Sequence, residues 1–351
     1  MDRSNIKHRL GNLALLLGTL LVIILIDRVL LTKYPLPRWK PDPVLHYKHR
    51  PGTYTWGKTY DNKPIFINRY GFHDDNFPEK KAEGELRGLI VGDSIVMGHG
   101  VTSAETFTNQ LEKLLPDNVS GYNTYQVINA GVQGYSTFQY LETLKRTLKF
   151  SPDFIVIGFC MNDPTEPYLV NKSYGGSGLD YHGIFQISQP WVSYLVNETG
   201  FGRFAIYIRK RITKKFSSVE REVRKEIYSV RRMAQFSRTD PVYIEVWKHV
   251  LSDLAEMYEL AGKEKIPIVL IIFPHTFQIS NEILKEPQKI LKQHANLHGV
   301  AYLDMTDEAE KLIIEGVPLD DLFLDSDHYT VKGHRVVANL LLRHLKSHGL
   351  I

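Results

Sequence analysis

Four short polar blocks contain the residues of this sequence whose types and spacing could perform chemistry. Along the chain they are Gly92-Asp93-Ser94, Asn129 to Gly134, Asn162-Asp163 and Asp325 to His328. Each block follows an apolar run that reads as a strand, or lies at the head of a helical pattern. Together they supply a serine, a histidine with two nearby carboxylates, and glycine and amide groups at turns. These are the parts of a site for nucleophilic catalysis by serine, and their fixed order makes the set more informative than any single block.

Ser94, at the end of an apolar run, is the candidate nucleophile, and His328 is the candidate base. A serine hydroxyl reacts poorly unless a base removes its proton. Asp325 lies three residues before His328, so a bend in this polar loop can bring its carboxylate to the imidazole Nδ1. Asp327 is the competing carboxylate, although an adjacent residue usually points elsewhere. The alternative interpretation is structural, because Gly-Asp-Ser favours turns and a histidine with two aspartates can cap a helix.

Gly134 and Asn162 are candidates to complete an oxyanion hole with the backbone N–H of the serine, Gly134 through its own backbone N–H and Asn162 through its side-chain amide. Both could instead be ordinary turn residues. His275, which follows an apolar strand, and Asp163 are candidates for substrate contact, and His275 could equally hydrogen-bond within its loop. No second histidine pair accompanies the aspartates near His328, so we predict no metal site and no cofactor.

The elements that must position these residues are strands and helices in alternation. Short apolar strands are predicted at residues 89–91, 126–128, 154–157, 266–273 and 300–303. Apolar residues at helical spacing follow the first two strands, precede the fourth, and form a closing helix at residues 336–345. Continuous apolar strands that alternate with helices indicate an α/β fold with a parallel sheet covered on both faces. In such sheets function collects at the carboxyl ends of the strands.

The main α/β domain is expected at residues 86–351, interrupted by a long insertion at about residues 171–241. Before it, residues 34–85 are rich in proline and aromatic residues and indicate an extended region with short strands, for example at residues 65–67. Within the insertion, residues 203–238 contain twelve Lys or Arg against three Glu. This basic segment fits a solvated helical cap, and the alternative is a surface that meets anionic lipid or an acidic polymer. Nucleic acid is not predicted, because the net charge is only +4 and no nucleic-acid motif accompanies it.

The N-terminal region, residues 1–33, contains an apolar segment long enough to span a bilayer. Residues 10–26 carry no charge, and apolar character resumes at residues 29–31. No small-residue cleavage pattern follows, so an uncleaved single-span anchor over residues 10–31 is favoured over a cleaved signal peptide or a buried core helix. Basic residues beyond the segment outnumber those before it, and the charge pattern therefore does not set its orientation. The single cysteine, Cys160, excludes an internal disulfide.

The four blocks together resemble those of the SGNH hydrolases of the GDSL esterase/lipase superfamily, over residues 86–346 apart from the insertion. In that family the serine of the first block is the nucleophile. The glycine and the asparagine of the next two blocks contribute to the oxyanion hole, and a D-x-x-H pair completes the triad. The matching residues here are Ser94, Gly134, Asn162, Asp325 and His328. The resemblance implies a flavodoxin-like three-layer α/β/α sandwich with a five-stranded parallel sheet.

One further segment strengthens the resemblance and two positions depart from it. The segment from Asn68 to Asp74 resembles a stretch that precedes the first block in membrane-anchored bacterial members. The glycine usual two residues before the third-block asparagine is Cys160 here, and the leucine usual after the serine is Ile95. Cys160 could narrow the oxyanion pocket, which affects substrate size more than mechanism. As a nucleophile Cys160 is disfavoured, because it ends an apolar strand with no partner histidine nearby in sequence.

The resemblance implies a serine esterase that hydrolyses a small acyl ester, such as an O-acetyl ester, on a carbohydrate or cell-envelope glycan. The alternatives are an O-acyltransferase that uses the same triad to modify a polysaccharide, and an inactive glycan-binding or assembly module. The sequence does not separate water from a sugar as the acyl acceptor. With the anchor, the expected location is the inner (cytoplasmic) membrane, single-pass, with the catalytic domain on the periplasmic side.

Overall fold

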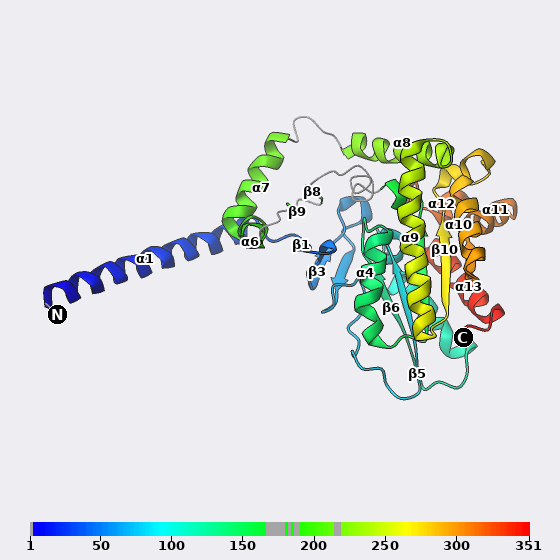
Figure 1. Cartoon of the computed structure of the whole chain (residues 1–351), viewed down its shortest axis with the longest axis horizontal. Coiled ribbons are helices and arrows are strands. Elements are labelled where there is room, and N and C mark those ends of the chain that lie inside the picture. Colours follow the sequence, from blue (N-terminus) through cyan, green and yellow to red (C-terminus); the bar gives the residue numbers. More distant parts are fainter. Residues whose placement is uncertain (1–2, 166–179, 182–183, 186–189, 214–218) are drawn as a thin grey trace. The chain divides into compact units, whose positions relative to one another are not determined.

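The structure, a computed structural model, describes residues 3–165, 180–181, 184–185, 190–213 and 219–351 (Figure 1). Contacts within the chain divide it into two compact units. The N-terminal unit consists of residues 1–48 and 178–219, and the sheet unit consists of residues 49–177 and 220–351. All four polar blocks lie in the sheet unit.

Five parallel strands form the central sheet of the sheet unit. They are β5 (Glu85–Gly92), β6 (Thr124–Gly131), β7 (Phe154–Cys160), β10 (Ile268–Phe273) and β11 (Ala301–Asp304). Their order in the sheet is β11-β10-β7-β5-β6. The first of these strands in the sequence, β5, is therefore an inner strand, and the later strands lie on both sides of it. Every residue of β7 is buried, which explains its uninterrupted apolar sequence. The predicted five-stranded parallel sheet is confirmed.

Helices cover both faces of this sheet. On one face α3 (Phe107–Asn118) and α13 (Val331–Ser347) pack against each other, and their apolar side chains share a core cluster with β5, β7 and β10. On the other face α4 (Thr137–Thr147) contacts α9 (Pro241–Glu264), and Trp247 of α9 stacks on Phe159 of β7. The three-layer α/β/α sandwich is therefore confirmed. Further helices of this unit are α2 (Ser94–Met97), α8 (Val219–Phe236), α10 (Glu286–Leu297), α11 (Met305–Ile314) and α12 (Leu319–Leu322).

Helix α3 begins later than its capping sequence indicates. Thr102 and Glu105 form a capping box, but this box opens a single 3-10 turn. The helix itself begins at Phe107, because the side chain of Thr106 accepts a hydrogen bond from the Asn109 N–H and caps it there. The 3-10 turns are η1 (Lys58–Tyr60), η2 (Ser103–Glu105), η3 (Leu148–Phe150), η4 (Asp163–Thr165), η5 (Thr276–Gln278) and η6 (Glu282–Leu284).

An antiparallel hairpin precedes the sheet in the chain. Strand β3 (Gly52–Thr55) pairs with β4 (Pro64–Ile67), in the region where the sequence predicted short strands. Trp56, Ile65 and Ile67 pack with Met97 of α2 in a buried cluster. Because this cluster joins the hairpin to the helix that begins at the candidate serine, the hairpin belongs to the sheet unit. The expected division between residues 85 and 86 therefore differs from the observed compact units.

A long helix dominates the N-terminal unit. Helix α1 (Arg3–Lys33) includes a stretch from His8 to Lys33 that is long and apolar enough to cross a membrane, and its most apolar part is not buried. By length and composition this stretch is a candidate membrane span or signal segment. Helix α7 (Gly200–Thr213) packs against α1 and against α6 (Pro190–Glu198). The strands of the unit are β1 (Trp39–Asp42), β2 (His46–His49), β8 (Asp180–Tyr181) and β9 (Ile184–Phe185).

Part of the predicted insertion at about residues 171–241 lies outside the described residues. Its described part contains α6, α7, α8 and the start of α9. The basic segment, residues 203–238, covers α7 and α8, which fall largely in different compact units. The segment is therefore helical at residues 203–213 and 219–236 and ends in a turn, but it is not one continuous surface of one unit.

Candidate active site

Ser94 lies where the first parallel strand ends. Strand β5 ends at Gly92, and Ser94 is the first residue of the short helix α2. The Asp93 carboxylate caps this helix by accepting a hydrogen bond from the Ile95 N–H at 2.9 Å. Only 4% of Ser94 is exposed. A tight strand-to-helix turn thus holds the hydroxyl at the carboxyl edge of the sheet.

His328 lies in a closed loop between α12 and α13. The Leu324 N–H donates to the His328 carbonyl oxygen at 2.7 Å across the loop. Asp325 Oδ1 accepts the backbone N–H groups of Asp327 at 3.1 Å and of His328 at 3.0 Å. These bonds explain how a spacing of three residues places the Asp325 carboxylate beside the imidazole ring.

A chain of hydrogen bonds joins Asp325, His328 and Ser94. His328 Nδ1 lies 2.8 Å from Asp325 Oδ2, and His328 Nε2 lies 2.9 Å from Ser94 Oγ. With the Nδ1 proton directed to the carboxylate, Nε2 presents a lone pair to the serine hydroxyl. This geometry lets the histidine take the serine proton while the aspartate orients the ring.

Negative charge surrounds the His328 imidazole. Burial lowers the pKa of His328, but the carboxylates of Asp327, Asp325 and Asp93 outweigh this effect and raise the pKa to about 10. Burial raises the pKa of Asp325, but the hydrogen bond and the positive charge of His328 outweigh it, so the net shift of this pKa is downward. Burial raises the pKa of Asp93 to about 6. The imidazolium that forms when His328 takes a proton is therefore stabilised.

Asp327, the competing carboxylate, lies farther from the ring. Its Oδ1 is 3.7 Å from His328 Nδ1, which is beyond hydrogen-bond distance. The same oxygen accepts the Ser326 hydroxyl at 2.9 Å. Asp327 therefore acts on His328 through its charge, whereas Asp325 acts through a direct hydrogen bond.

Gly134 and Asn162 lie in the loops that follow β6 and β7. Gly134 has a φ of 73°, in the left-handed region that favours glycine. Asn162 is buried. Gly92 at the end of β5 is opposite Gly131 of β6 and Gly158 of β7, so the loops after these three strands begin at the same edge. The assignment of Gly134 and Asn162 to an oxyanion hole stays a prediction.

The two predicted substrate contacts, Asp163 and His275, lie in the interior. Asp163 Oδ1 accepts the Tyr140 hydroxyl at 2.6 Å, and Oδ2 accepts the Cys160 N–H at 3.1 Å. These bonds tie the loop after β7 to α4. His275 follows β10 and is only 1% exposed. The structure favours a packing role for both residues, and substrate contact by either stays a prediction.

In the part of the chain that the structure describes, two groups of side chains offer atoms that could hold a metal ion. Cys160, His275 and Asp327 form one group, and Asp325, Asp327 and His328 form the other, with the potential ligand atoms of each group within 4.8 Å of one another. In the second group Asp325 and His328 are bonded to each other, as a triad requires. In the first, burial raises the pKa of the Cys160 thiol, whereas a metal ligand must be the thiolate. The absence of a metal and of a cofactor stays a prediction.

His99 and Tyr60, which lie beside the hydrogen-bonded residues, were not recognised from the sequence. The ring of His99, after α2, stacks on the ring of His328 with centroids 4.3 Å apart. His99 Nε2 lies 3.0 Å from the Tyr60 hydroxyl, and the ring of Trp56 packs against the ring of His99 with centroids 4.6 Å apart. Burial and the nearby Asp325 raise the pKa of Tyr60 to about 12, so the phenol stays a hydrogen-bond donor. A histidine five residues after the candidate serine was the available signal, but spacing alone does not reveal a ring that supports another ring.

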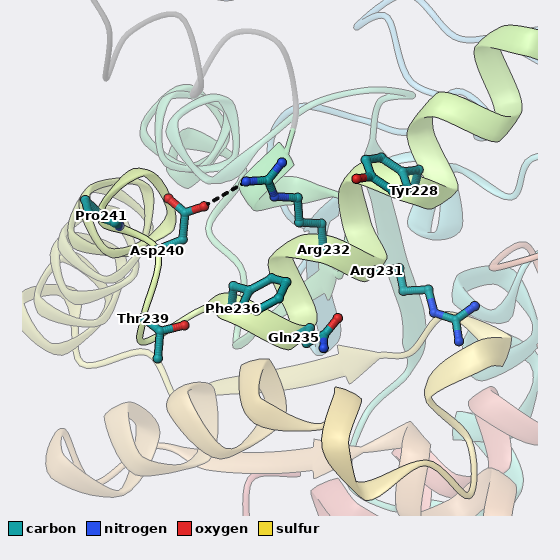
Figure 2. Close-up of a pocket in the computed structure, with 8 residues that line it drawn as sticks. All are labelled: Tyr228, Arg231, Arg232, Gln235, Phe236, Thr239, Asp240 and Pro241. Atoms are coloured by element: carbon teal, nitrogen blue, oxygen red, sulfur yellow. Dashed lines mark hydrogen bonds and ion pairs between the residues drawn. The ribbon is translucent and has the colours of Figure 1, made fainter.

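A hollow of about 790 Å³ lies at the corner between α8 and α9 (Figure 2). Arg232 Nη2 forms an ion pair with Asp240 Oδ2 at 3.3 Å on its wall. The hollow is lined by Tyr228, Arg231, Arg232, Gln235, Phe236, Thr239, Asp240 and Pro241. Because none of these residues belongs to the four polar blocks, the hollow is not the cleft of the candidate active site.

The model of one protein family, the GDSL-like lipase/acylhydrolase family, matches residues 90–336. The match begins within β5, ends within α13 and includes all four polar blocks. The chain therefore belongs to the GDSL-like lipase/acylhydrolase family, and it is an ester hydrolase. A search of curated proteins found no match.

Several solved structures are similar to this chain. TesA has 16% sequence identity to this chain, and its structure matches with a TM-score of 0.44. The match covers 76% of this chain and 99% of the TesA chain. The lipase/acylhydrolase from Enterococcus faecalis is 18% identical, with coverages of 75% and 97% and a TM-score of 0.41. A catalytic mutant of Axe2, an acetylxylan esterase from Geobacillus stearothermophilus, is 14% identical, with coverages of 74% and 94% and a TM-score of 0.44. At these values the similarity does not define a substrate.

Proposed function

We propose that the protein is a membrane-tethered serine esterase that removes a small acyl group, such as acetyl, from a carbohydrate or cell-envelope glycan. The observation that carries the proposal is the chain of hydrogen bonds from Asp325 through His328 to Ser94, at 2.8 and 2.9 Å. Membership of an ester-hydrolase family supports the reaction class. The resemblance of the polar blocks to those of the SGNH hydrolases supports a small acyl ester on a glycan as the substrate.

In the first half of the reaction, Ser94 Oγ attacks the carbonyl carbon of the ester while His328 Nε2 takes the hydroxyl proton. Asp325 holds the Nδ1–H and stabilises the imidazolium. The backbone N–H groups of Ser94 and Gly134 and the side-chain amide of Asn162 donate hydrogen bonds to the oxyanion. When the tetrahedral intermediate collapses, His328 gives its proton to the leaving sugar oxygen. The acyl group remains on Ser94.

In the second half, a water molecule attacks the acyl carbonyl carbon and His328 Nε2 takes a proton from it. Collapse of the second tetrahedral intermediate breaks the bond to Ser94 Oγ, and the histidine returns the proton to that oxygen. The products are the sugar alcohol and the free carboxylic acid, so the cycle consumes only water. The stack of His99 on His328 helps to keep the ring in one plane through both halves.

The proposal is tested by labelling the full-length protein with a fluorophosphonate probe, which reacts with activated serine hydroxyls. We compare wild type with Ser94→Ala, and with Ser347→Ala as a control at an exposed serine. Adduct on wild type and Ser347→Ala, but not on Ser94→Ala, is the expected result. Failure of a folded wild type to react, or an adduct that survives Ser94→Ala, would overturn the assignment of the nucleophile.

Substrate class is tested by incubating acetylated oligosaccharides with wild type and Ser94→Ala. Release of acetate by the wild type alone is expected. Acetyl groups found on an added acceptor sugar, with no free acetate, would instead favour the O-acyltransferase. Binding of the oligosaccharide without any release would favour the glycan-binding module.

We also propose that residues 10–31 of α1 form a single-pass anchor in the inner membrane, with the sheet unit on the periplasmic side. The exposure and apolar composition of the segment His8–Lys33 support this proposal. Protease added to spheroplasts should digest the sheet unit, and the mass of the purified protein should include α1. A mature N-terminus beyond Lys33 would replace the anchor by a cleaved signal, and protection of the sheet unit in intact spheroplasts would reverse the topology.

A further inference from the structure

Helices α6 and α7 expose large apolar side chains of a kind that is usually buried when a helix lies at a protein surface in water. On α6, Trp191, Tyr194 and Leu195 lie at i, i+3 and i+4, on one face, and are 68%, 61% and 50% exposed. On α7, Phe201 and Ile212 lie eleven residues apart, on one face, and are 44% and 63% exposed. Exposed apolar patches of this kind mark contacts with a partner or a membrane. We call this patch of residues 191–212 the α6–α7 surface.

A hydrogen bond fixes α7 to α1 where the uncharged part of α1 ends. Asp27 is the first charged residue after the uncharged run of residues 10–26. Its Oδ1 accepts the Phe201 N–H at 3.1 Å, near the start of α7. Gly200 permits this approach, because a Cβ there would lie 2.2 Å from the Asp27 carbonyl oxygen. The N-terminus of α7 is therefore held about one helical turn before the end of the proposed anchor, residues 10–31, near the depth where α1 would leave the hydrocarbon layer.

Aromatic side chains continue the contact beyond this point. Tyr34, just after α1, lies against Phe204 and Tyr207 of α7, with ring centroids 5.3 and 4.8 Å apart. Ile206 between them is buried, whereas Ile208 and Ile212 remain exposed. Helix α7 thus uses one face to hold α1 and leaves another apolar face without protein cover among the described residues.

Positive charge accompanies this apolar face. The sequence of α7 contains four Lys or Arg and no Asp or Glu. Arg209 and Arg211 are exposed beside Ile208 and Ile212. Helices that are basic on one face and rich in aromatic and aliphatic residues on the other lie in the membrane interface, with the apolar face about 5–10 Å into the headgroup boundary. Trp and Tyr are enriched at that depth.

We propose that the α6–α7 surface binds the interface of an anionic lipid bilayer around the exit of α1, with Trp191, Leu195 and Ile212 among the headgroups. Lipid is the occupant because α7 packs against α1, and the apolar side chains of α1 are themselves exposed. A second copy of the chain would bring Arg209 and Arg211 of each copy together, which like charges disfavour. The proposal assumes that α1 spans the membrane, and it goes beyond the esterase activity, which does not depend on it.

The test measures the depth of fluorescent labels on the full-length protein in nanodiscs of phosphatidylcholine and phosphatidylglycerol. Cysteine variants Leu195→Cys and Ile212→Cys carry an environment-sensitive fluorophore. Ile314→Cys is the matched control, because Ile314 is an apolar side chain of the sheet unit that is 85% exposed. Leu17→Cys in α1 reports the span itself. The native Cys160 is buried, so the unsubstituted chain serves as the labelling blank.

We expect labels at 195 and 212 to shift their emission to the blue and to be quenched more by nitroxides near the headgroups than by nitroxides deep in the acyl chains. The label at 17 should show the reverse order, and the label at 314 should be quenched only by aqueous iodide. Replacing Arg209 and Arg211 with Glu should increase iodide quenching at 212, more so with phosphatidylglycerol present than in phosphatidylcholine alone.

Two outcomes would overturn the proposal while Leu17→Cys still reports a spanning helix. Iodide quenching at 195 and 212 equal to that at 314 would place the surface in water. Protection of both labels from iodide and from lipid nitroxides would show that protein, not lipid, covers them. Iodide quenching at 17 would instead show that α1 does not span the bilayer, which would remove the assumed anchor and the proposal with it.

Discussion

Asp327→Asn should lower the pH at which the enzyme becomes active. Asp327 Oδ1 lies 3.7 Å from His328 Nδ1, and the side chains are only 5% and 16% exposed. Two unit charges at about 4 Å interact by about 4 kcal/mol at an effective dielectric constant of about 20. Since one pKa unit corresponds to about 1.4 kcal/mol, removal of this charge should lower the pKa of His328 by about 1–3 units.

The direction of the activity change follows from the role of the base. His328 must be neutral at Nε2 to take the serine proton, so kcat/KM rises as pH passes upward through the pKa of His328 in the free enzyme. With a pKa raised to about 10, wild type should gain activity over the alkaline range, and Asp327→Asn should gain it nearer neutrality. Initial rates with a chromogenic acetyl ester, corrected for spontaneous hydrolysis at each pH, give both profiles.

Asp325→Asn is the matched control, because it removes a charge of the same kind from a carboxylate that binds the ring directly. It should lower the limiting kcat at high pH, where His328 is neutral in both proteins, by about 10,000-fold, since the wrong tautomer then faces the serine. A rising limb of Asp327→Asn that coincides with that of wild type would refute the reasoning that Asp327 acts through its charge. A loss of rate in Asp327→Asn as large as that in Asp325→Asn would show that the two aspartates have exchanged roles.

Three further substitutions test the site and its support. Asn162→Ala should lower kcat about 100- to 1000-fold with little change in KM, as loss of one oxyanion donor does, and an unchanged kcat on the same ester would remove Asn162 from the oxyanion hole. Gly134→Ala should lower the free energy of unfolding by about 1–2 kcal/mol, because a φ of 73° is strained for alanine, and urea denaturation measures this. Burial lowers the pKa of His334 to about 3. Below about pH 6.5 the unfolded chain therefore binds a proton that the folded chain does not. The free energy of unfolding should then fall by up to about 1.4 kcal/mol for each unit by which the pH is lowered. His334→Gln should reduce that slope in urea titrations, and an equal slope in both proteins would locate the acid sensitivity elsewhere.

The inner part of the fold was readable because burial on both faces leaves a strand almost no choice of residue type. Residues 154–160 are all buried and nearly all apolar, so the strand could be recognised without its neighbours. The hydrogen-bonded arrangement of Asp325, His328 and Ser94 could be anticipated for a related reason, whereas its catalytic role stays a prediction. Asp325 reaches His328 within one loop at a spacing of three residues, and Ser94 lies two residues after the end of β5.

The support around the triad could not be predicted in the same way. His99 acts by stacking on a ring that is more than two hundred residues away in sequence, and neither its type nor its spacing encodes that contact. The roles of Asp163 and His275 were predicted from their position at the strand ends. Position at the edge does not tell whether a side chain points to substrate or inward, and the hydrogen bond from Tyr140 to Asp163 turns that carboxylate inward.

The hydrogen bond between Asp27 and Phe201 has a consequence for the order of events during synthesis. The two residues are separated by 174 positions, and β5, β6 and β7 are encoded between them. At about 5–20 residues per second, α1 leaves the ribosome roughly 9–35 s before its partner helix exists. Strands β5, β6 and β7 are thus translated after α1 is complete but before its partner α7 exists, and the N-terminal unit can close only after them.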